Sequence, residues 1–195
     1  FEQAAVFSSE LTRQGERLSN VVFMGMGEPF RNYDNVFEAA SRIVGTLGVG
    51  ARHVTISTVG VAPVVRQFAD DCVANNLQLG LAISLHAASD AARGAIMPVN
   101  RRHDLHELME ACLYYTTVTG RRISFEWALI AGENDGEEQA RELGQLLRPL
   151  KGRAHVNLIP LNPTRGFPGQ PTGVAAARSF VDMLAHFGVP GTVRV

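Results

Sequence analysis

The chain has 195 residues, of which 46% are hydrophobic, and its formal net charge is −1. This length suits one domain with a substantial core, and the near-neutral charge carries no nucleic-acid signature by itself. No stretch approaches the ~20 apolar residues of a membrane span, and no signal peptide opens the chain. The cysteines, Cys72 and Cys112, give neither a disulfide framework nor a metal-ligand spacing. We therefore expect a soluble, cytoplasmic globular protein without a membrane partner.

Apolar periodicity predicts strands that alternate with helices along the chain. The expected strands are 21–24, 53–58, 79–86, 123–130, 155–160 and 192–195. The expected helices are 2–17, one that begins near 33 and ends by 45, 63–74, 104–119, one that begins at 135, and 175–187. This order is typical of consecutive βαβ units on a parallel sheet. The fold class is therefore α/β, either a barrel or a doubly wound sheet.

Polar residues recur where the expected strands end. The first strand runs into Gly25-Met26-Gly27-Glu28-Pro29, where glycines let the backbone approach a bound molecule. The later strand ends carry Ser57, Ser84, His86 and Asn162. Each has an ordinary explanation: the serines can cap helices, the histidine can be a hydrogen-bonded core residue, and the asparagine can shape a turn. Because parallel folds bind ligands at the carboxyl ends of their strands, the common placement indicates a shared polar pocket.

One further carboxylate lies within a strand. Glu126, in Ser124-Phe125-Glu126-Trp127, is expected to point into a barrel. A buried carboxylate needs partners, and we expect Arg122 or His86 to supply one. No phosphate-loop, HExxH, GxSxG or CxxC motif is present. The polar residues at the strand ends therefore indicate a pocket but do not identify a reaction.

Four extended motifs carry a family resemblance. Segments 21–29, 54–60, 82–87 and 156–163 resemble, in the same order, the RlmN family of dual-specificity RNA methyltransferases of the radical SAM superfamily. Segments 97–100 and 134–135 also fall where that family has similar residues. The resemblance implies a partial (β/α)6 radical SAM barrel, with residues 1–195 forming one core domain that binds S-adenosylmethionine. The binding residues that it implies are Gly27, Glu28, Ser57, Ser84, Leu85, His86 and Asn162.

The family also needs residues that this chain does not contain. A CxxxCxxC loop holds its 4Fe-4S cluster, and two further cysteines carry the methyl group and resolve the RNA adduct. The resemblance matches neither Cys72 nor Cys112 to these roles. We therefore expect a fragment of a longer protein, truncated at both ends, with no catalytic or metal-binding residue of its own. Alone, it is expected to be inactive and to bind S-adenosylmethionine weakly.

The resemblance implies that the intact enzyme methylates carbon 2 of adenine in 23S rRNA and tRNA. It also implies an electron donor such as a flavodoxin, and a monomer. Candidate RNA contacts are Arg101, Arg102 and the loop 164–173. Three alternatives stay open: a Cfr-like methyltransferase acting on carbon 8, a non-catalytic module that binds a nucleoside or RNA, and an unrelated barrel enzyme. The last predicts a glycine-rich phosphate site, for which the loop 166–173 is too interrupted by proline.

Overall fold

The computed structural model describes residues 1–162 and 168–194. Six strands form one parallel sheet in the order β1-β2-β3-β4-β5-β6. The strands are β1 (Val21–Phe23), β2 (Val54–Thr58), β3 (Gly80–Ser84), β4 (Ile123–Leu129), β5 (Ala154–Pro160) and β6 (Gly191–Val193). Within the described residues β1 and β6 are the two edges, so the barrel is open. The predicted α/β class and partial (β/α)6 barrel are confirmed.

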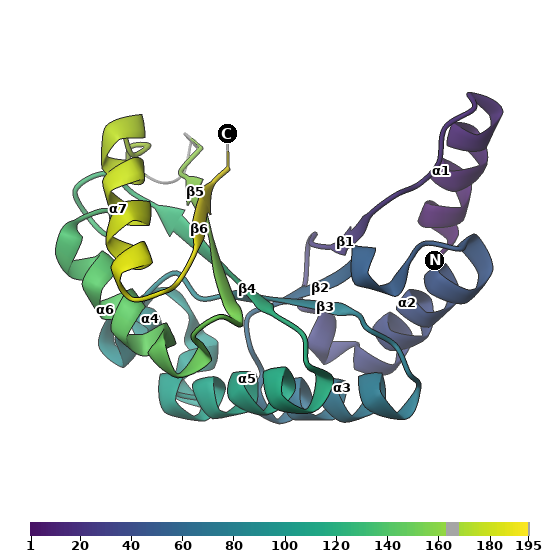
Figure 1. The fold of residues 1–195 in the computed structure, drawn as a ribbon, viewed down its shortest axis with the longest axis horizontal. Helices are drawn as coiled ribbons and strands as arrows, with labels where there is room; N and C mark the ends of the chain where they lie inside the picture. The colour runs from purple at the N-terminus through teal and green to yellow at the C-terminus, as the bar shows by residue number, and fades with distance from the viewer. Residues whose placement is uncertain (163–167, 195) are drawn as a thin grey trace.

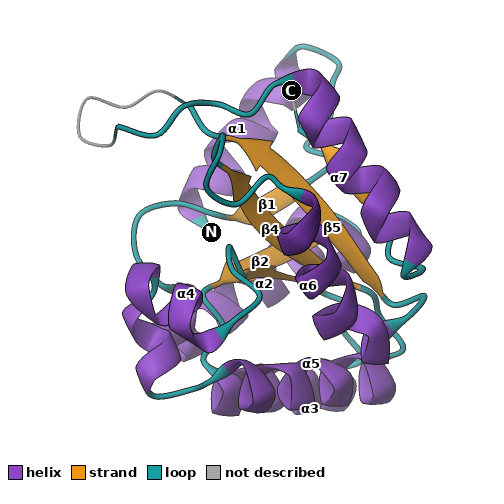
Figure 2. Ribbon diagram, turned by 90° about the vertical axis from the view of Figure 1, so that its left-hand side faces the viewer, coloured by secondary structure: helices purple, strands orange, loops and turns teal. Residues whose placement is uncertain are grey.

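Helices lie on the outside of the curved sheet (Figure 1). The α-helices are α1 (Glu2–Arg13), α2 (Tyr33–Leu47), α3 (Ala62–Ala74), α4 (Asp90–Ile96), α5 (Leu105–Thr119), α6 (Glu137–Leu147) and α7 (Val174–His186). Short 3-10 helices are η1 (Pro29–Arg31), η2 (Ala51–His53), η3 (Pro98–Arg101) and η4 (Arg148–Leu150). In Figure 2, α3 and α5 lie along the base of the molecule, below the orange strands.

The two faces of the sheet differ in chemistry because successive side chains of a strand point to opposite faces. On β4, Phe125 and Trp127 are at most 1% exposed and belong to the core between sheet and helices. Trp127 packs against Phe180 of α7, with ring centroids 5.9 Å apart. Glu126 points the other way, toward the concave face of the sheet. The core therefore lies on the helix side, and the concave face carries the polar positions.

Local signals set several helix ends. The Asp104 carboxylate accepts a hydrogen bond from the Glu107 N–H at 2.8 Å and caps α5, as predicted. Gly120 (φ 66°) ends α5 and Gly48 (φ 68°) ends α2, both in the left-handed conformation that glycine adopts without strain. The sequence predicts such helix ends because a cap depends on residues within one helical turn.

The sequence prediction also contained errors. It missed α4, which at seven residues is too short to show periodicity. It began α6 at Asp135, whereas the helix begins at Glu137, because the Asp135 carboxylate accepts hydrogen bonds from the Gly132 N–H and the Thr172 hydroxyl. The first helix ends at Arg13, not at residue 17. Residues 163–167, which include the first four residues of the predicted loop 164–173, lie outside the described residues, as does Val195.

Across the residues that the structure describes, no helix is both long and apolar enough to cross a bilayer.

Candidate functional site

Glu28 fastens the loop after β1 to the end of β2. Its Oε1 accepts hydrogen bonds from the Phe30 N–H at 2.9 Å and from the Thr58 hydroxyl at 2.5 Å. Its Oε2 accepts from the Val59 N–H at 2.8 Å. An ionised carboxylate has about four acceptor positions, so these three bonds leave room for a ligand donor. The structure thus gives Glu28 a positioning role that the sequence did not reveal.

The glycines before Glu28 face open space. A Cβ built on Gly25 or Gly27 would meet no atom within 4 Å, and Gly27 has a φ of +98° that a side chain would strain. Two cavities adjoin this loop. One, of about 720 Å³, lies against α1, β1 and α2, and the other, of about 520 Å³, is lined by Val59 and by 96–99. Both volumes lie within the range of small-molecule sites.

Ser57 and Ser84 lie on the concave face of the sheet. Ser57 pairs in register with Ala82, two residues before Ser84 on β3, so the two serines share one face. The alternative that they cap helices is wrong, because α3 and α4 have Val61 and Ser89 as their N-cap residues. The lining residues of the two cavities do not include Ser57, Ser84, His86 or Asn162.

Leu85 and His86 form the turn that leaves β3. The Leu85 side chain is fully buried in the core, so only its backbone could reach a ligand. His86 adopts a φ of +59°, which is uncommon for a residue other than glycine and tends to mark functional positions. Its Nδ1 accepts a hydrogen bond from the Ala128 N–H at 3.0 Å. That nitrogen is therefore unprotonated, and Nε2 carries the proton as a donor.

A change of pH tests this arrangement. Burial, and secondarily the charge of Arg93, lowers the pKa of His86 from 6.5 to about 4. Because the folded pKa lies below the unfolded value, the stabilisation is complete above pH 6.5 and is lost as pH falls toward 4. We expect up to about 3 kcal/mol of pH-dependent unfolding free energy. The measurement is urea unfolding at pH 7 to 4, for wild type and His86→Asn, an exchange that tolerates positive φ.

The variant should lose this pH dependence, whereas His106→Gln, on the exposed side of α5, should keep it. A His86 imidazole that titrates near 6.5 in the folded chain by NMR would contradict the assignment.

Arg93 ties the ends of β2 and β3 together from α4. Its side chain is 0% exposed, and its guanidinium donates to the carbonyls of Val59 (2.6 Å), Ser84 (3.3 Å) and Leu85 (3.2 Å). Burial lowers its pKa from the usual value. Sequence reasoning missed this residue. The available signal was a single arginine between the expected strand 79–86 and segment 97–100, which carries part of the family resemblance.

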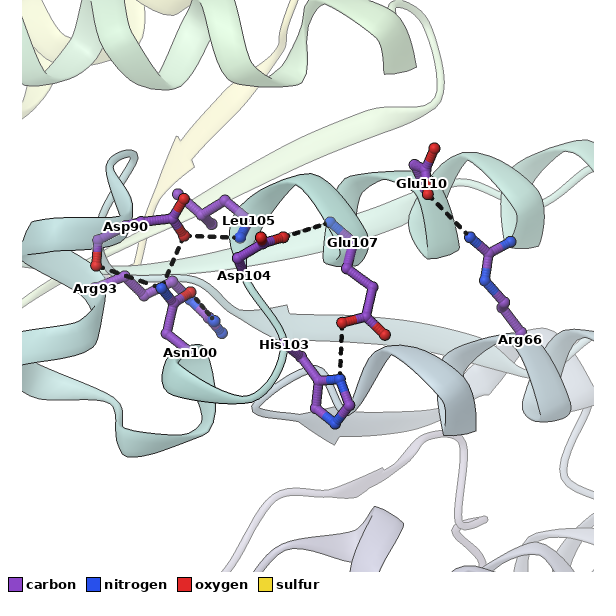
Figure 3. Close-up of polar contacts among 9 residues, drawn as sticks. All are labelled: Arg66, Asp90, Arg93, Asn100, His103, Asp104, Leu105, Glu107 and Glu110. Atoms are coloured by element: carbon purple, nitrogen blue, oxygen red, sulfur yellow. Dashed lines mark hydrogen bonds and ion pairs between the residues drawn. The ribbon is translucent and has the colours of Figure 1, made fainter.

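A polar network continues from Arg93 to α5 (Figure 3). The Asn100 side chain accepts from Arg93 Nη1 at 2.8 Å and donates to Asp90 Oδ1 at 2.8 Å. The same Asp90 oxygen accepts from the Leu105 N–H at 2.8 Å. Since Glu28 holds the Val59 N–H and Arg93 holds the Val59 carbonyl, hydrogen bonds run from the loop after β1 to the start of α5.

The other noted segment, 134–135, shapes the exit from β4. Asn134 accepts from the Ile130 N–H at 2.8 Å and donates to the Ala128 carbonyl at 2.8 Å. Ala128 is also the residue whose N–H binds His86, so this loop supports the histidine.

Glu126 does not have the partner that the sequence suggested. Its Oε1 accepts from the Asn157 side chain at 2.9 Å, not from Arg122 or His86, so that prediction is wrong. Asn157 directly faces Glu126 on the neighbouring strand, and that pairing follows only from the register. Burial raises the pKa of this carboxyl, which is 4% exposed.

Asn162 follows β5 and is exposed at the same end of the sheet. The Leu161 N–H donates to the Leu129 carbonyl and keeps this exit beside β4. Arg101 and Arg102, at the end of η3, are exposed, while residues 164–167 of the loop 164–173 lie outside the described residues.

The described residues do not provide a metal centre. They contain no group of three or more His, Cys, Asp or Glu side chains that could hold a metal ion. Cys72 and Cys112 are buried in α3 and α5, and burial raises both thiol pKa values to about 12.

Comparison with solved structures places this fold in a class. A radical SAM methyltransferase from Sphaerobacter thermophilus matches with a TM-score of 0.91 and 40% identity over 99% of this chain and 55% of its own. A domain of pyruvate-formate lyase-activating enzyme from Bacteroides vulgatus, with a TM-score of 0.67 and 18% identity, shares the fold. The fold is therefore one that this chain shares with radical SAM enzymes.

Within that class the chain is similar to RlmN. The dual-specificity RNA methyltransferase RlmN 1 of Myxococcus xanthus is 50% identical over 94% of this chain and 50% of its own length. The probable RlmN of Dictyoglomus turgidum is 42% identical over 99% of this chain and 54% of its own. No family model matches the chain. The resemblance to the RlmN family is therefore confirmed, and the chain spans about half the length of the curated relatives it matches.

Proposed function

We propose that the protein containing this chain is a radical SAM enzyme that methylates carbon 2 of adenine in 23S rRNA and tRNA. In this proposal the chain supplies the barrel that binds S-adenosylmethionine. The observation that carries it is the 50% identity to a dual-specificity RNA methyltransferase over 94% of the chain. The 0.91 TM-score to a radical SAM methyltransferase supports the same class.

The chemistry of the strand ends supports S-adenosylmethionine as the ligand. Open space above Gly25 and Gly27 allows a ligand to lie against the backbone. The residues proposed to hold it are Gly27, Glu28, Ser57, Ser84, His86, Asn162 and the backbone of Leu85. Glu28 offers a carboxylate that can accept from an ammonium group. His86 offers a neutral Nε2–H donor, because its Nδ1 is already bonded. When bound, the cofactor supplies the methyl group and the radical source.

The described residues do not fit a 4Fe-4S cluster. Its usual ligands are cysteine thiolates, and the two cysteines of this chain are buried in helices with raised thiol pKa values. We propose that the cluster ligands lie outside these 195 residues. We also propose a cytoplasmic monomer whose partners are 23S rRNA, tRNA and an electron donor such as a flavodoxin.

Asn162→Ala in the full-length protein tests the proposed pocket. We expect the KM for S-adenosylmethionine to rise about 10-fold, because a pocket amide that binds polar cofactor groups is lost. Iron content should stay unchanged. The measurement is methylation of an RNA transcript at limiting cofactor, with mass spectrometry of the product base.

Asn35→Ala, on the exposed side of α2, is the matched control and should leave KM unchanged. An unaltered KM in Asn162→Ala rejects the pocket assignment. Methylation at carbon 8 identifies a Cfr-like enzyme, and RNA binding without methylation identifies a non-catalytic module.

A further inference from the structure

Four polar side chains form a row across the concave face of the sheet. The strand register pairs Ser84 with Glu126, Glu126 with Asn157, and Asn157 with Thr192. Residues paired in register on parallel strands point to the same face, and neighbouring strands lie about 4.8 Å apart. We call Ser84, Glu126, Asn157 and Thr192 the polar row. It spans β3, β4, β5 and β6, at one level of the sheet.

Hydrogen bonds orient three side chains of the polar row, Thr192, Asn157 and Glu126. Asn157 uses its amide N–H to donate to Glu126 Oε1, so its Oδ1 is free to accept from the Thr192 hydroxyl at 2.9 Å. Since that hydroxyl has given its only proton, it accepts from His155 Nε2 at 3.0 Å. Every donor in this series is therefore oriented, and the series ends on one oxygen of Glu126.

The second oxygen of Glu126 has no hydrogen-bond partner among the described residues. The side chain is 4% exposed, and its Oε2 is shielded from solvent. A buried acceptor without a donor is unfavourable, and native structures rarely leave one unless a water, an ion or a ligand completes it. Packing does not explain the residue, because the core lies on the opposite face, with Phe125 and Trp127.

The position of Ser84 indicates what completes the site. Under the proposed function, Ser84 contacts S-adenosylmethionine, and Glu126 lies one strand away on the same face. A ligand that reaches the serine hydroxyl is therefore within a few ångströms of the carboxylate. The donors that such a ligand offers are the ribose hydroxyls and the exocyclic amino group of adenosine.

We propose that Glu126 is a further ligand-binding residue, whose Oε2 accepts a hydrogen bond from an amino or hydroxyl group of an adenosine bound on the concave face. The inference rests on the proposed function, in which both the cofactor and the RNA substrate present an adenosine. Asn157 and Thr192 are positioning residues, which hold the carboxylate so that Oε2 faces the ligand.

The test is Glu126→Gln in the full-length, cluster-containing protein. Glutamine keeps an oxygen for Asn157 and places an NH2 group where Oε2 lies, so a donor would meet a donor. One arm measures the affinity for S-adenosylhomocysteine by calorimetry. The other measures the affinity for an RNA stem-loop with the target adenosine. We expect about a 10-fold or larger loss in one arm. Ser124→Ala, two residues earlier on the same face of β4, should change neither affinity.

Loss in the first arm assigns Glu126 to the cofactor, and loss in the second assigns it to the RNA adenosine. Unchanged affinities in both arms, with a wild-type enzyme that methylates RNA, overturn the inference and leave the proposed function intact. A wild-type protein that does not methylate RNA overturns the proposed function instead. If Glu126→Gln does not fold, the same two affinities are measured for Glu126→Asp. It keeps the charge but withdraws the oxygens by one methylene, and a wild-type affinity in both arms would refute the proposal.

Discussion

Replacing Arg93 by methionine is expected to lower the free energy of unfolding by about 3–5 kcal/mol. The guanidinium is fully buried and donates to the carbonyls of Val59, Ser84 and Leu85 and to the side chain of Asn100. Methionine fills a similar length but donates nothing, so four acceptors lose a partner. Since a domain is typically stable by only 5–15 kcal/mol, this is a large share of the total. Urea unfolding of the chain measures it.

Arg66→Met is the matched control. Arg66 lies on α3, forms an exposed ion pair with Glu110 at 3.6 Å and packs over the Tyr114 ring at 5.6 Å. Exposed pairs contribute little, so we expect a loss below about 1 kcal/mol. Arg93→Lys should recover only part of the loss, because an ammonium group lacks the planar set of donors. Equal losses for Arg93→Met and Arg66→Met would show that the network does not hold the strand ends.

The sequence predicted the parts of this fold that depend on local signals. Alternating strands and helices predicted the parallel sheet, and the glycines that follow the first apolar run predicted where β1 ends. The cap at Asp104 was also correct, because its partner Glu107 is three residues away. Where chemistry is encoded within one turn or one strand end, residue type and spacing are sufficient.

The errors concern contacts between distant segments. Arg93 lies between Ala92 and Gly94 in a helix of seven residues, and nothing nearby shows that the strand ends will bury it. The partner of Glu126 is 31 residues away. That pairing depends on the strand register, because a shift of one residue would turn every side chain of the strand to the opposite face of the sheet. Both residues are charged and buried, and residue type alone predicts that charged side chains are exposed. At such positions the structure supplies the hydrogen-bond partners that the sequence alone does not indicate.

Glu28→Gln is expected to reduce both stability and cofactor affinity. The new amide can place its NH2 group in either of two positions. In one position it faces the Val59 N–H, and in the other it faces the Phe30 N–H and the Thr58 hydroxyl, so in both it meets a donor where the carboxylate offered an acceptor. A buried donor without an acceptor costs about 1–3 kcal/mol, which urea unfolding should detect. Glu38→Gln, whose carboxylate is 69% exposed on α2, is the control and should cost less than about 0.5 kcal/mol.

A second variant separates the two roles proposed for Glu28. Thr58 is 1% exposed, so its side chain cannot contact a cofactor, and Thr58→Val removes one donor to Glu28 while leaving the carboxylate in place. If Glu28 binds the ammonium group of S-adenosylmethionine, Glu28→Gln should weaken cofactor binding in the full-length protein by about 10-fold or more. Thr58→Val should then lower stability with a much smaller change in affinity. If the two variants lose affinity equally, Glu28 acts only by holding the loop after β1 against β2, and the direct contact with the cofactor is rejected.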